Sequence, residues 1–84
     1  MASRILYTPS AAKALRRMDS TTRARIEGKI EQLAAEPAAL ANNVKALRGV
    51  AGVYRLRVGD WRVLYTDDHV VLNVLKVASR GSVY

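Results

Sequence analysis

The 84-residue sequence predicts one α+β domain of order β-α-α-β-β-β, with a helical hairpin packed on one face of a four-stranded, mainly antiparallel sheet. Two alternating apolar and polar runs flank a Gly-Asp pair, which is typical of a β-hairpin because glycine supplies the positive φ of a two-residue turn. Two segments with apolar residues at helical spacing precede this hairpin, and an almost wholly apolar run follows it. We expect residues 1–84 to form a single domain without repeats.

The N-terminal half predicts a strand and two helices. Residues 4–8 are apolar and β-prone, which indicates a strand. Thr8 can cap the first helix and Pro9 suits its first turn. The second helix is expected over residues 21–36, because Pro37 ends the apolar pattern. The apolar stripes are Ala11, Leu15 and Met18 in the first helix and Ile26, Ile30 and Leu33 in the second.

The C-terminal half predicts a three-stranded meander. Residues 37–52 are rich in alanine and asparagine, and we interpret them as a connection. Strands are expected over 53–58 and 61–66, and a polar turn at Asp67-Asp68 leads to an apolar interior strand over 70–77. Pairing the N-terminal strand beside this last strand would place the most apolar strand in the centre of the sheet.

The hairpin register separates two kinds of side chain. If Val58 pairs with Trp61, Arg57 lies opposite Arg62, which costs roughly a few tenths to 1 kcal/mol by like-charge repulsion. A domain that tolerates this repulsion is predicted to bind an anion there. The face that also carries Arg55 is therefore basic. The opposite face is predicted to anchor the core through Tyr54, Leu56, Trp61, Val63 and Tyr65.

A convergent group of basic residues is expected at one end of the sheet. In a meander, Arg57, Arg62 and Arg80 lie at the same end, Arg55 lies one pleat further along, and Tyr84 is within reach. Taken singly, each has a simpler interpretation, such as a solvated strand face or a frayed end. Taken together, they favour an anion site.

The composition limits the classes of molecule that this protein is expected to bind but does not identify one. Fourteen Lys and Arg residues stand against seven Asp and Glu, giving a net charge of +7, and ten of the fourteen are arginine. The planar arginine fork suits phosphate, so nucleic acid and an acidic protein are both candidate partners. Cysteine is absent, which excludes disulfides, and no transmembrane run or signal peptide is evident. We expect a soluble intracellular protein with no membrane partner.

The sequence favours chemistry without a metal or cofactor. It lacks a carboxylate pair near the arginines, a histidine cluster and a glycine-rich phosphate loop, and His69 adjoins the distant Asp67-Asp68 turn. RNA permits such chemistry because its own 2′-hydroxyl can attack the adjacent phosphate. The protein then needs to position the chain, stabilise charge and move protons.

Over nearly its whole length the chain resembles the RelE/ParE superfamily of toxins from type II toxin-antitoxin pairs. The element order carries the resemblance, together with Leu47-Arg48-Gly49, Tyr54-Arg-Leu-Arg57, Gly59-Asp-Trp-Arg62-Val-Leu-Tyr65 and Val77-Ala-Ser-Arg80-Gly-Ser-Val-Tyr84. RelE-like members cleave messenger RNA in the ribosomal A site without metal, and an antitoxin wraps and neutralises them. The resemblance therefore implies a ribosome-dependent mRNA endonuclease that inhibits translation.

The resemblance also implies residue roles. Arg62 and Arg80 would stabilise the scissile phosphate and leaving group, and Tyr84 would stack on or orient a base. The implied catalytic set is Arg57, Arg62, Arg80 and Tyr84, and the implied RNA-binding set is Lys45, Arg48 and Arg55. The chain departs from its relatives at Arg55 and Arg57, often lysines, and at Ser79, often histidine, which leaves no evident general base.

The implied partners are a small acidic antitoxin, the ribosomal A site with mRNA, and operator DNA bound through the antitoxin, all in the cytoplasm. Two alternatives stay open: a ParE-like inhibitor of DNA gyrase, and a non-catalytic homologue that acts only in the antitoxin complex. The helix residues Arg16, Arg17, Arg23 and Arg25 are candidates for ribosomal RNA contacts, although a solvated helix face explains them more simply.

Overall fold

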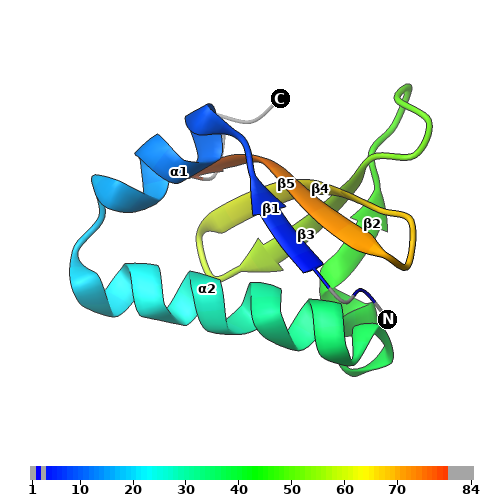
Figure 1. The fold of residues 1–84 in the computed structure, drawn as a ribbon, viewed down its shortest axis with the longest axis horizontal. Coiled ribbons are helices and arrows are strands. Elements are labelled where there is room, and N and C mark those ends of the chain that lie inside the picture. The colour runs from blue at the N-terminus through cyan, green and yellow to red at the C-terminus, as the bar shows by residue number, and fades with distance from the viewer. Residues whose placement is uncertain (1, 3, 80–84) are drawn as a thin grey trace.

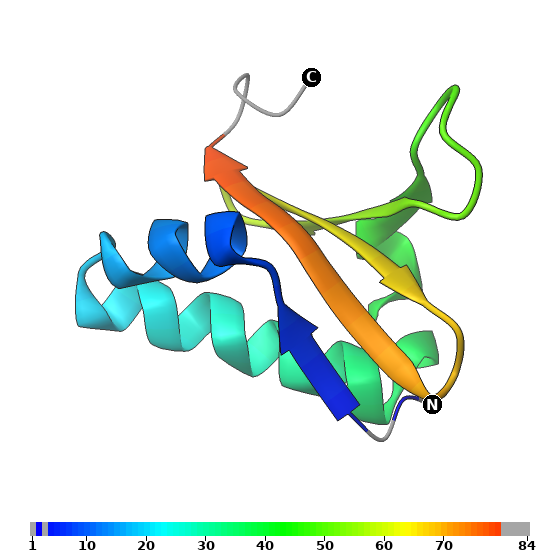
Figure 2. The same ribbon diagram turned by 45° about the horizontal axis from the view of Figure 1, so that its top comes forward.

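A five-stranded sheet of order β1-β5-β4-β3-β2 forms the body of the protein, and both α-helices lie on one side of it (Figures 1 and 2). The computed structural model describes residue 2 and residues 4–79. The elements are β1 (Arg4–Tyr7), α1 (Pro9–Arg16), α2 (Ser20–Ala35), the 3-10 helix η1 (Pro37–Asn43), β2 (Val44–Ala46), β3 (Tyr54–Val58), β4 (Trp61–Asp67) and β5 (Val71–Ser79). The predicted α+β class is confirmed. Among the described helices, none has the length and apolar character needed to cross a bilayer.

The sheet has five strands rather than the four predicted. The additional strand is β2, within the segment that we interpreted as a connection, and it pairs antiparallel with β3 so that Val44 faces Leu56. Three residues are too few to show an alternating pattern in the sequence. Pairing of β2 satisfies backbone groups along the edge of β3 that would otherwise need water, and this depends on tertiary context.

The central position of β5 agrees with the sequence-based expectation. Strand β1 pairs with β5 in parallel, and β4 pairs with it on the other side. A bulge interrupts the second pairing, since Leu64 faces Lys76 but Tyr65 faces Val74, which leaves Leu75 as the extra residue. Because the bulge resets the alternation, both Val74 and Val77 are buried although they are three residues apart.

Thr8 joins α1 to this bulge. Its Oγ1 accepts a hydrogen bond from the backbone N of Ala11 at 3.2 Å, which confirms the predicted N-cap. The same hydroxyl donates to the backbone O of Leu75 at 2.7 Å, and the backbone N of Thr8 donates to the O of Val74 at 3.0 Å. One residue therefore satisfies a helix terminus and the carbonyl of the bulged residue.

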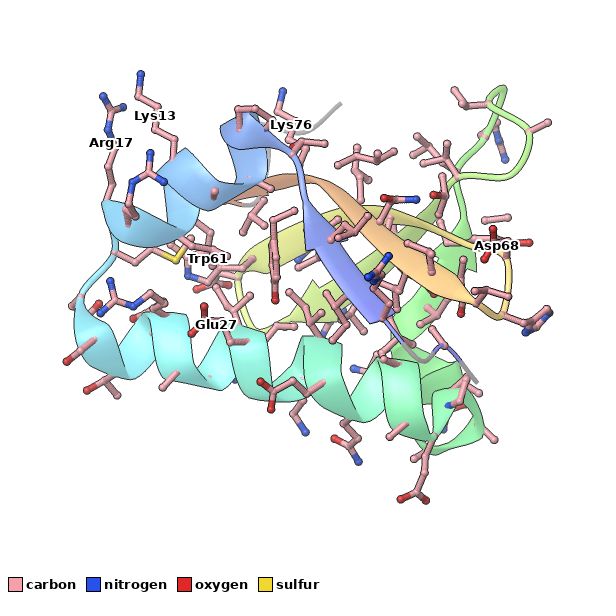
Figure 3. The ribbon with its side chains drawn as sticks, viewed as in Figure 1. Lys13, Arg17, Glu27, Trp61, Asp68 and Lys76 are labelled. Atoms are coloured by element: carbon pink, nitrogen blue, oxygen red, sulfur yellow. The ribbon has the colours of Figure 1, made fainter. Side chains whose placement is uncertain are left out.

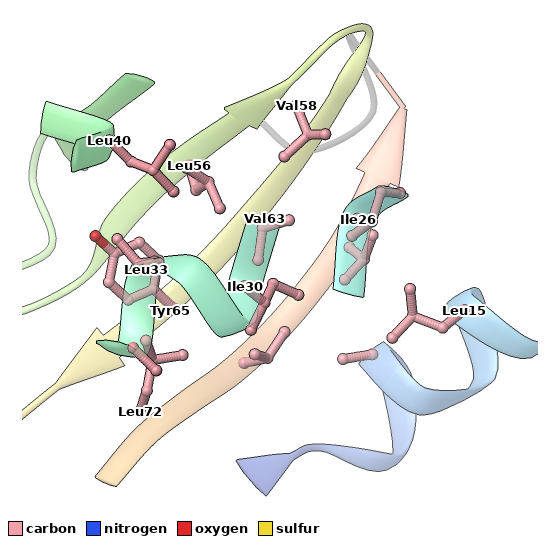
Figure 4. Packing of buried hydrophobic residues seen from close by; sticks show 14 of the residues in the cluster. Leu15, Ile26, Ile30, Leu33, Leu40, Leu56, Val58, Val63, Tyr65 and Leu72 are labelled. Atoms are coloured by element: carbon pink, nitrogen blue, oxygen red, sulfur yellow. The ribbon is translucent and has the colours of Figure 1, made fainter. Parts of the chain in front are cut away.

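The core lies between the helices and the sheet. The predicted stripe of α2 is buried, and its Leu33 lies beside Tyr65 of β4 (Figure 4). Asp19 caps α2 by accepting from the N of Thr22 at 3.1 Å. The complete set of buried apolar residues is Ala2, Ala11, Leu15, Ile26, Ile30, Leu33, Ala34, Leu40, Leu56, Val58, Val63, Tyr65, Leu72, Val74 and Val77.

The predicted hairpin contribution to the core is confirmed for Leu56, Val63 and Tyr65, confirmed in part for Trp61, and wrong for the exposed Tyr54. Tyr54 is 37% exposed, and Trp61 is half-buried against the core. Both residues stand at the first position of their strands, where fewer neighbouring elements cover them. Tyr54 instead contacts the ring of Tyr65, with centroids 5.8 Å apart and planes inclined by 31°.

Replacing Thr8 with valine should lower the free energy of unfolding by about 1–2 kcal/mol, because the N-cap bond and the bond to Leu75 are lost while the β-branched shape is kept. Urea denaturation followed by circular dichroism measures the change. Thr21→Val, at an exposed position in α2, is the matched control and should change stability by less than about 0.5 kcal/mol. Equal losses of unfolding free energy for the two substitutions would contradict the stabilising link that Thr8 makes between α1 and β5.

Stability should fall in alkali partly because of Tyr65. Burial, followed by the nearby Asp67 and Tyr54, raises the pKa of Tyr65 to about 12 from the ordinary value of 10.0. The folded state holds this proton more tightly than the unfolded state, so the stabilisation is complete below about pH 10 and is lost as the pH rises toward about 12. Urea midpoints across this range should decline less steeply for Tyr65→Phe than for the wild type. Parallel declines would show that another group is responsible.

Candidate anion-binding site

Cationic side chains line the face of the sheet that the helices leave open. Cross-strand neighbours form two rows, one with Lys45 beside Arg55 and the other with Arg57 beside Arg62. Leu56 between the two β3 arginines is buried on the helix side, so alternation directs the arginines to the opposite face. We call the cationic side chains of these rows the basic face, and they are Lys45, Arg55, Arg57 and Arg62.

The predicted register of the hairpin is confirmed at every position. Val58 pairs with Trp61 and Arg57 with Arg62 across the Gly59-Asp60 turn. Gly59 has a φ of 59°, which is the left-handed conformation that a glycine adopts at little cost. The turn therefore places two guanidinium groups on one face of the hairpin.

Arg62 bends back over this turn. Its Nη1 lies 3.4 Å from the backbone O of Gly59 and 3.3 Å from the backbone O of Trp61, in the geometry of a donor to both. These acceptors are neutral, and both contacts are long for N–H···O hydrogen bonds. The two carbonyls thus orient the side chain of the half-buried Arg62 and bring no negative charge to it.

Two adjoining hollows lie beside the basic face, and Lys45 and Arg55 line both. The larger has a volume of about 480 Å³, within the roughly 300–1,000 Å³ of small-molecule sites. The smaller, of about 220 Å³, extends toward Arg57 and two asparagines. The lining of the larger hollow is Lys45, Ala46, Leu47, Arg48 and Arg55, and that of the smaller is Asn42, Asn43, Lys45, Arg55 and Arg57. The structure therefore brings Lys45, Arg48 and Arg55 together.

Arg80 and Tyr84 lie outside the described residues, so their predicted roles stay predictions. Strand β5 ends at Ser79, which pairs with Trp61 directly after the hairpin turn. The described end of β5 is thus beside Arg62 in the register of the sheet.

Sequence reasoning missed Asn42 and Asn43, which line the smaller hollow. The sequence also did not predict that Arg25 lies near the hairpin. A Cβ built on Gly59 would lie 3.1 Å from both terminal nitrogens of Arg25, so this α2 guanidinium is seated against the turn. No sequence pattern links positions 25 and 59, because their approach depends on how α2 crosses the sheet.

The acidic turn is at the other end of β4, as predicted, and Asp68 lies far from Trp61 in Figure 3. The backbone N–H groups of Val70 and Val71 donate to Oδ1 of Asp68, and these bonds hold the pKa of its carboxyl below the ordinary value. His69 is a turn residue with a φ of 71°. Within the described part of the chain, no three His, Asp or Glu side chains gather into a possible metal site.

A small α+β domain with a helix-free cationic face is suited to binding a polyanion or an acidic protein. Comparison with family models identifies its class. The model of the ParE toxin of the type II toxin-antitoxin system parDE matches residues 5–84. The chain belongs to this family, within the RelE/ParE superfamily, and is a toxin of a type II toxin-antitoxin system.

Solved structures of RelE toxins share the fold. A chain of the archaeal RelE-RelB complex from Pyrococcus horikoshii has 29% identity and a TM-score of 0.76, covering 98% of this chain and 99% of that chain. The isolated Escherichia coli RelE toxin has 25% identity and a TM-score of 0.72, with coverages of 90% and 82%. A chain of the RelBE2 toxin-antitoxin complex from Mycobacterium tuberculosis has 27% identity and a TM-score of 0.68, covering 92% of this chain and 96% of that chain. Among curated proteins, none matches by sequence.

Replacing Arg57 with threonine should raise the free energy of unfolding by a few tenths to about 1 kcal/mol at low salt, because the repulsion across the hairpin is removed. The gain should shrink in about 1 M salt, where charges are screened within roughly 3 Å. Urea denaturation at both salt concentrations measures it. Arg4→Thr on β1, where the register neighbour is Val71, is the control and should show no such gain. If Arg57→Thr lowers the free energy of unfolding, or raises it equally at both salt concentrations, repulsion between Arg57 and Arg62 is not the cause.

Proposed function

We propose that this toxin is a metal-independent, ribosome-dependent mRNA endonuclease that inhibits translation. The observation that carries the proposal is the pair of cationic rows on the helix-free face, with Arg57 and Arg62 directly opposite each other beside the hairpin turn. Such an arrangement is unfavourable without an anion and favourable with a phosphate between the two guanidinium groups.

The proposed reaction uses the RNA as its own nucleophile. The 2′-oxygen forms a bond to phosphorus while the bond from phosphorus to the 5′-oxygen breaks, which gives a 2′,3′-cyclic phosphate and a 5′-hydroxyl end. The proton lost from the 2′-hydroxyl and the proton gained by the 5′-oxygen balance. Arg57 and Arg62 stabilise the negative charge that accumulates on the phosphoryl oxygens.

The other predicted residues support binding. Lys45, Arg48 and Arg55 line the larger hollow and hold the neighbouring nucleotide. By family resemblance, Arg80 stabilises the leaving group and Tyr84 stacks on a base. Arginine keeps its charge at neutral pH, so we assign proton abstraction to water or ribosomal RNA in the A site rather than to Arg55 or Arg57.

The proposed partner is a small acidic antitoxin. Structures similar to this chain are complexes of RelE with RelB. The net charge of +7 favours an acidic partner as well as RNA. The antitoxin would also carry the complex to operator DNA, and all of these partners place the toxin in the cytoplasm.

A second candidate function is inhibition of DNA gyrase without cleavage. The observation that favours it is the family model, which describes ParE toxins and matches residues 5–84. The two functions predict different damage in the cell. Mapping 5′ ends of translated messages detects cleavage, whereas scoring gyrase-linked DNA breaks detects poisoning of the topoisomerase.

Arg62→Ala and Arg80→Ala should each abolish growth inhibition when the toxin is expressed without antitoxin, and new 5′ ends within messages should disappear. Removing one charge-stabilising group from an active site typically costs about 10²–10³ in rate. Circular dichroism should show an unchanged fold. Arg4→Ala, on β1 at the other edge of the sheet, is the matched control and should remain toxic.

Three results would count against this proposal. Retained toxicity in both variants would remove the assigned site. DNA breaks without new RNA ends would establish the gyrase alternative. Normal growth with the wild-type toxin would indicate a non-catalytic homologue that acts only in the antitoxin complex.

A further inference from the structure

A third guanidinium reaches the tip of the hairpin from the helix layer. Arg25 is exposed on α2, and its side chain extends to Gly59. A Cβ built on Gly59 would lie 3.1 Å from Nη1, 3.1 Å from Nη2 and 3.3 Å from Cζ of Arg25. Those distances are shorter than ordinary van der Waals contact, so a side chain at position 59 would require this guanidinium to shift by a few tenths of an ångström.

The Gly59-Asp60 turn therefore lies between two arginines. The guanidinium of Arg25 lies beside the position that a Cβ would take on Gly59, while Nη1 of Arg62 is 3.4 Å from the carbonyl oxygen of the same residue. Arg57 stands opposite Arg62 in the register. Arginines from three elements, α2, β3 and β4, thus lie at or next to one two-residue turn.

This arrangement concentrates positive charge instead of neutralising it. The contacts of Arg62 are to neutral carbonyls, and that of Arg25 is to a glycine. Like charges gathered at one turn repel, and anionic groups bound to them would relieve the repulsion. A guanidinium offers a planar fork of donors that matches phosphate oxygens, and arginine is used here in preference to lysine at all three positions.

The position of Arg25 extends the basic face beyond the sheet. Arg57 and Arg62 face away from the helices, whereas Arg25 approaches the turn from the helix side. A ligand that contacts all three must pass around the end of the hairpin. A polynucleotide has regularly spaced phosphates along a flexible chain and can do this, whereas a single small anion can contact only one side.

We propose that Arg25 binds an RNA phosphate next to the one held by Arg57 and Arg62, and so leads the RNA backbone around the hairpin turn toward α2. This inference rests on the proposed RNA-directed function and adds a contact that the sequence alone explains as a solvated helix residue. An acidic peptide is the competing ligand, and the experiment below separates the two.

The test compares Arg25→Ala and Arg25→Lys with Lys29→Ala. Lys29 is one turn further along the same exposed helix, and its Nζ contacts Oε1 of Gln32 at 3.5 Å instead of the hairpin. The probe is a single-stranded 2′-O-methyl oligoribonucleotide, which binds but lacks the nucleophile for cleavage. Fluorescence anisotropy gives the dissociation constant over a series of salt concentrations, and circular dichroism checks the fold of each variant.

Arg25→Ala should weaken binding about fivefold at about 0.1 M salt, because loss of one phosphate contact on a single strand lowers the slope of log K against log salt by about 0.7. Arg25→Lys should keep the slope, since the charge is retained. Lys29→Ala should change affinity by less than about twofold. Equal effects of Arg25→Ala and Lys29→Ala would overturn the inference, as would no binding of the probe by the wild type.

Poly-L-glutamate serves as the acidic-peptide probe in the same assay. If Arg25→Ala weakens binding of poly-L-glutamate but not of RNA, the inference is overturned in favour of an acidic protein. The proposed function is judged separately by message cleavage in a translating extract. Intact messages together with Arg25-dependent RNA binding would sink only the proposed function, whereas cleavage and RNA binding unaffected by Arg25→Ala would sink only the role of Arg25.

Discussion

The pairing of β3 with β4 across the Gly59-Asp60 turn is the constraint on which the rest of the molecule depends. In this register Leu56 and Val63 enter the core, while Arg57 and Arg62 face the side without helices. A slip of one residue would exchange the two faces and bury the arginines, which is prohibitively costly for unpaired charges. The core and the basic face are therefore two results of a single register.

The opposite side of the sheet meets a second requirement, because β5 lies between β1 and β4 and packs against the helices. Strict alternation would send either Val74 or Val77 away from the core. The bulge at Leu75 allows both to be buried. The hydroxyl of Thr8 donates a hydrogen bond to the carbonyl of Leu75 and at the same time caps α1. The start of the first helix is in this way tied to the central strand, so the helix layer and the sheet are positioned together.

Positive charge is concentrated near the Gly59-Asp60 turn, where repulsion between arginines is expected to lower the stability of the fold. Arg57 and Arg62 oppose each other, Arg25 approaches the same turn, and the acidic turn at Asp68 is at the far end of β4. Neutral backbone carbonyls orient Arg62, so its charge stays available to a ligand. Such a surface suits the binding of an anionic partner, because charge that is already paired within the protein interacts less strongly with a ligand.

Local pattern was enough for much of this structure. The Gly-Asp turn with its flanking alternation set the register of the hairpin, the Thr8-Pro9 cap located α1, and apolar spacing identified the buried stripe of α2. The grouping of Lys45, Arg48 and Arg55 came from family resemblance, and the shared hollow now gives it a geometric basis. Each of these features depends on residues close in sequence or on a motif that spans them.

Tertiary structure alone decided the remaining features. Strand β2 forms because the edge of β3 is available to pair with it. The bulge at Leu75 allows residues from distant segments to pack in one core. Arg25 contacts Gly59 because of the path of α2 across the sheet. The sequence by itself determined the faces of the hairpin and the apolar stripes, since these follow from the fixed periodicities of strand and helix. Contacts between residues far apart in the chain carry no such periodic signal, so only the folded arrangement shows which arginines share one turn.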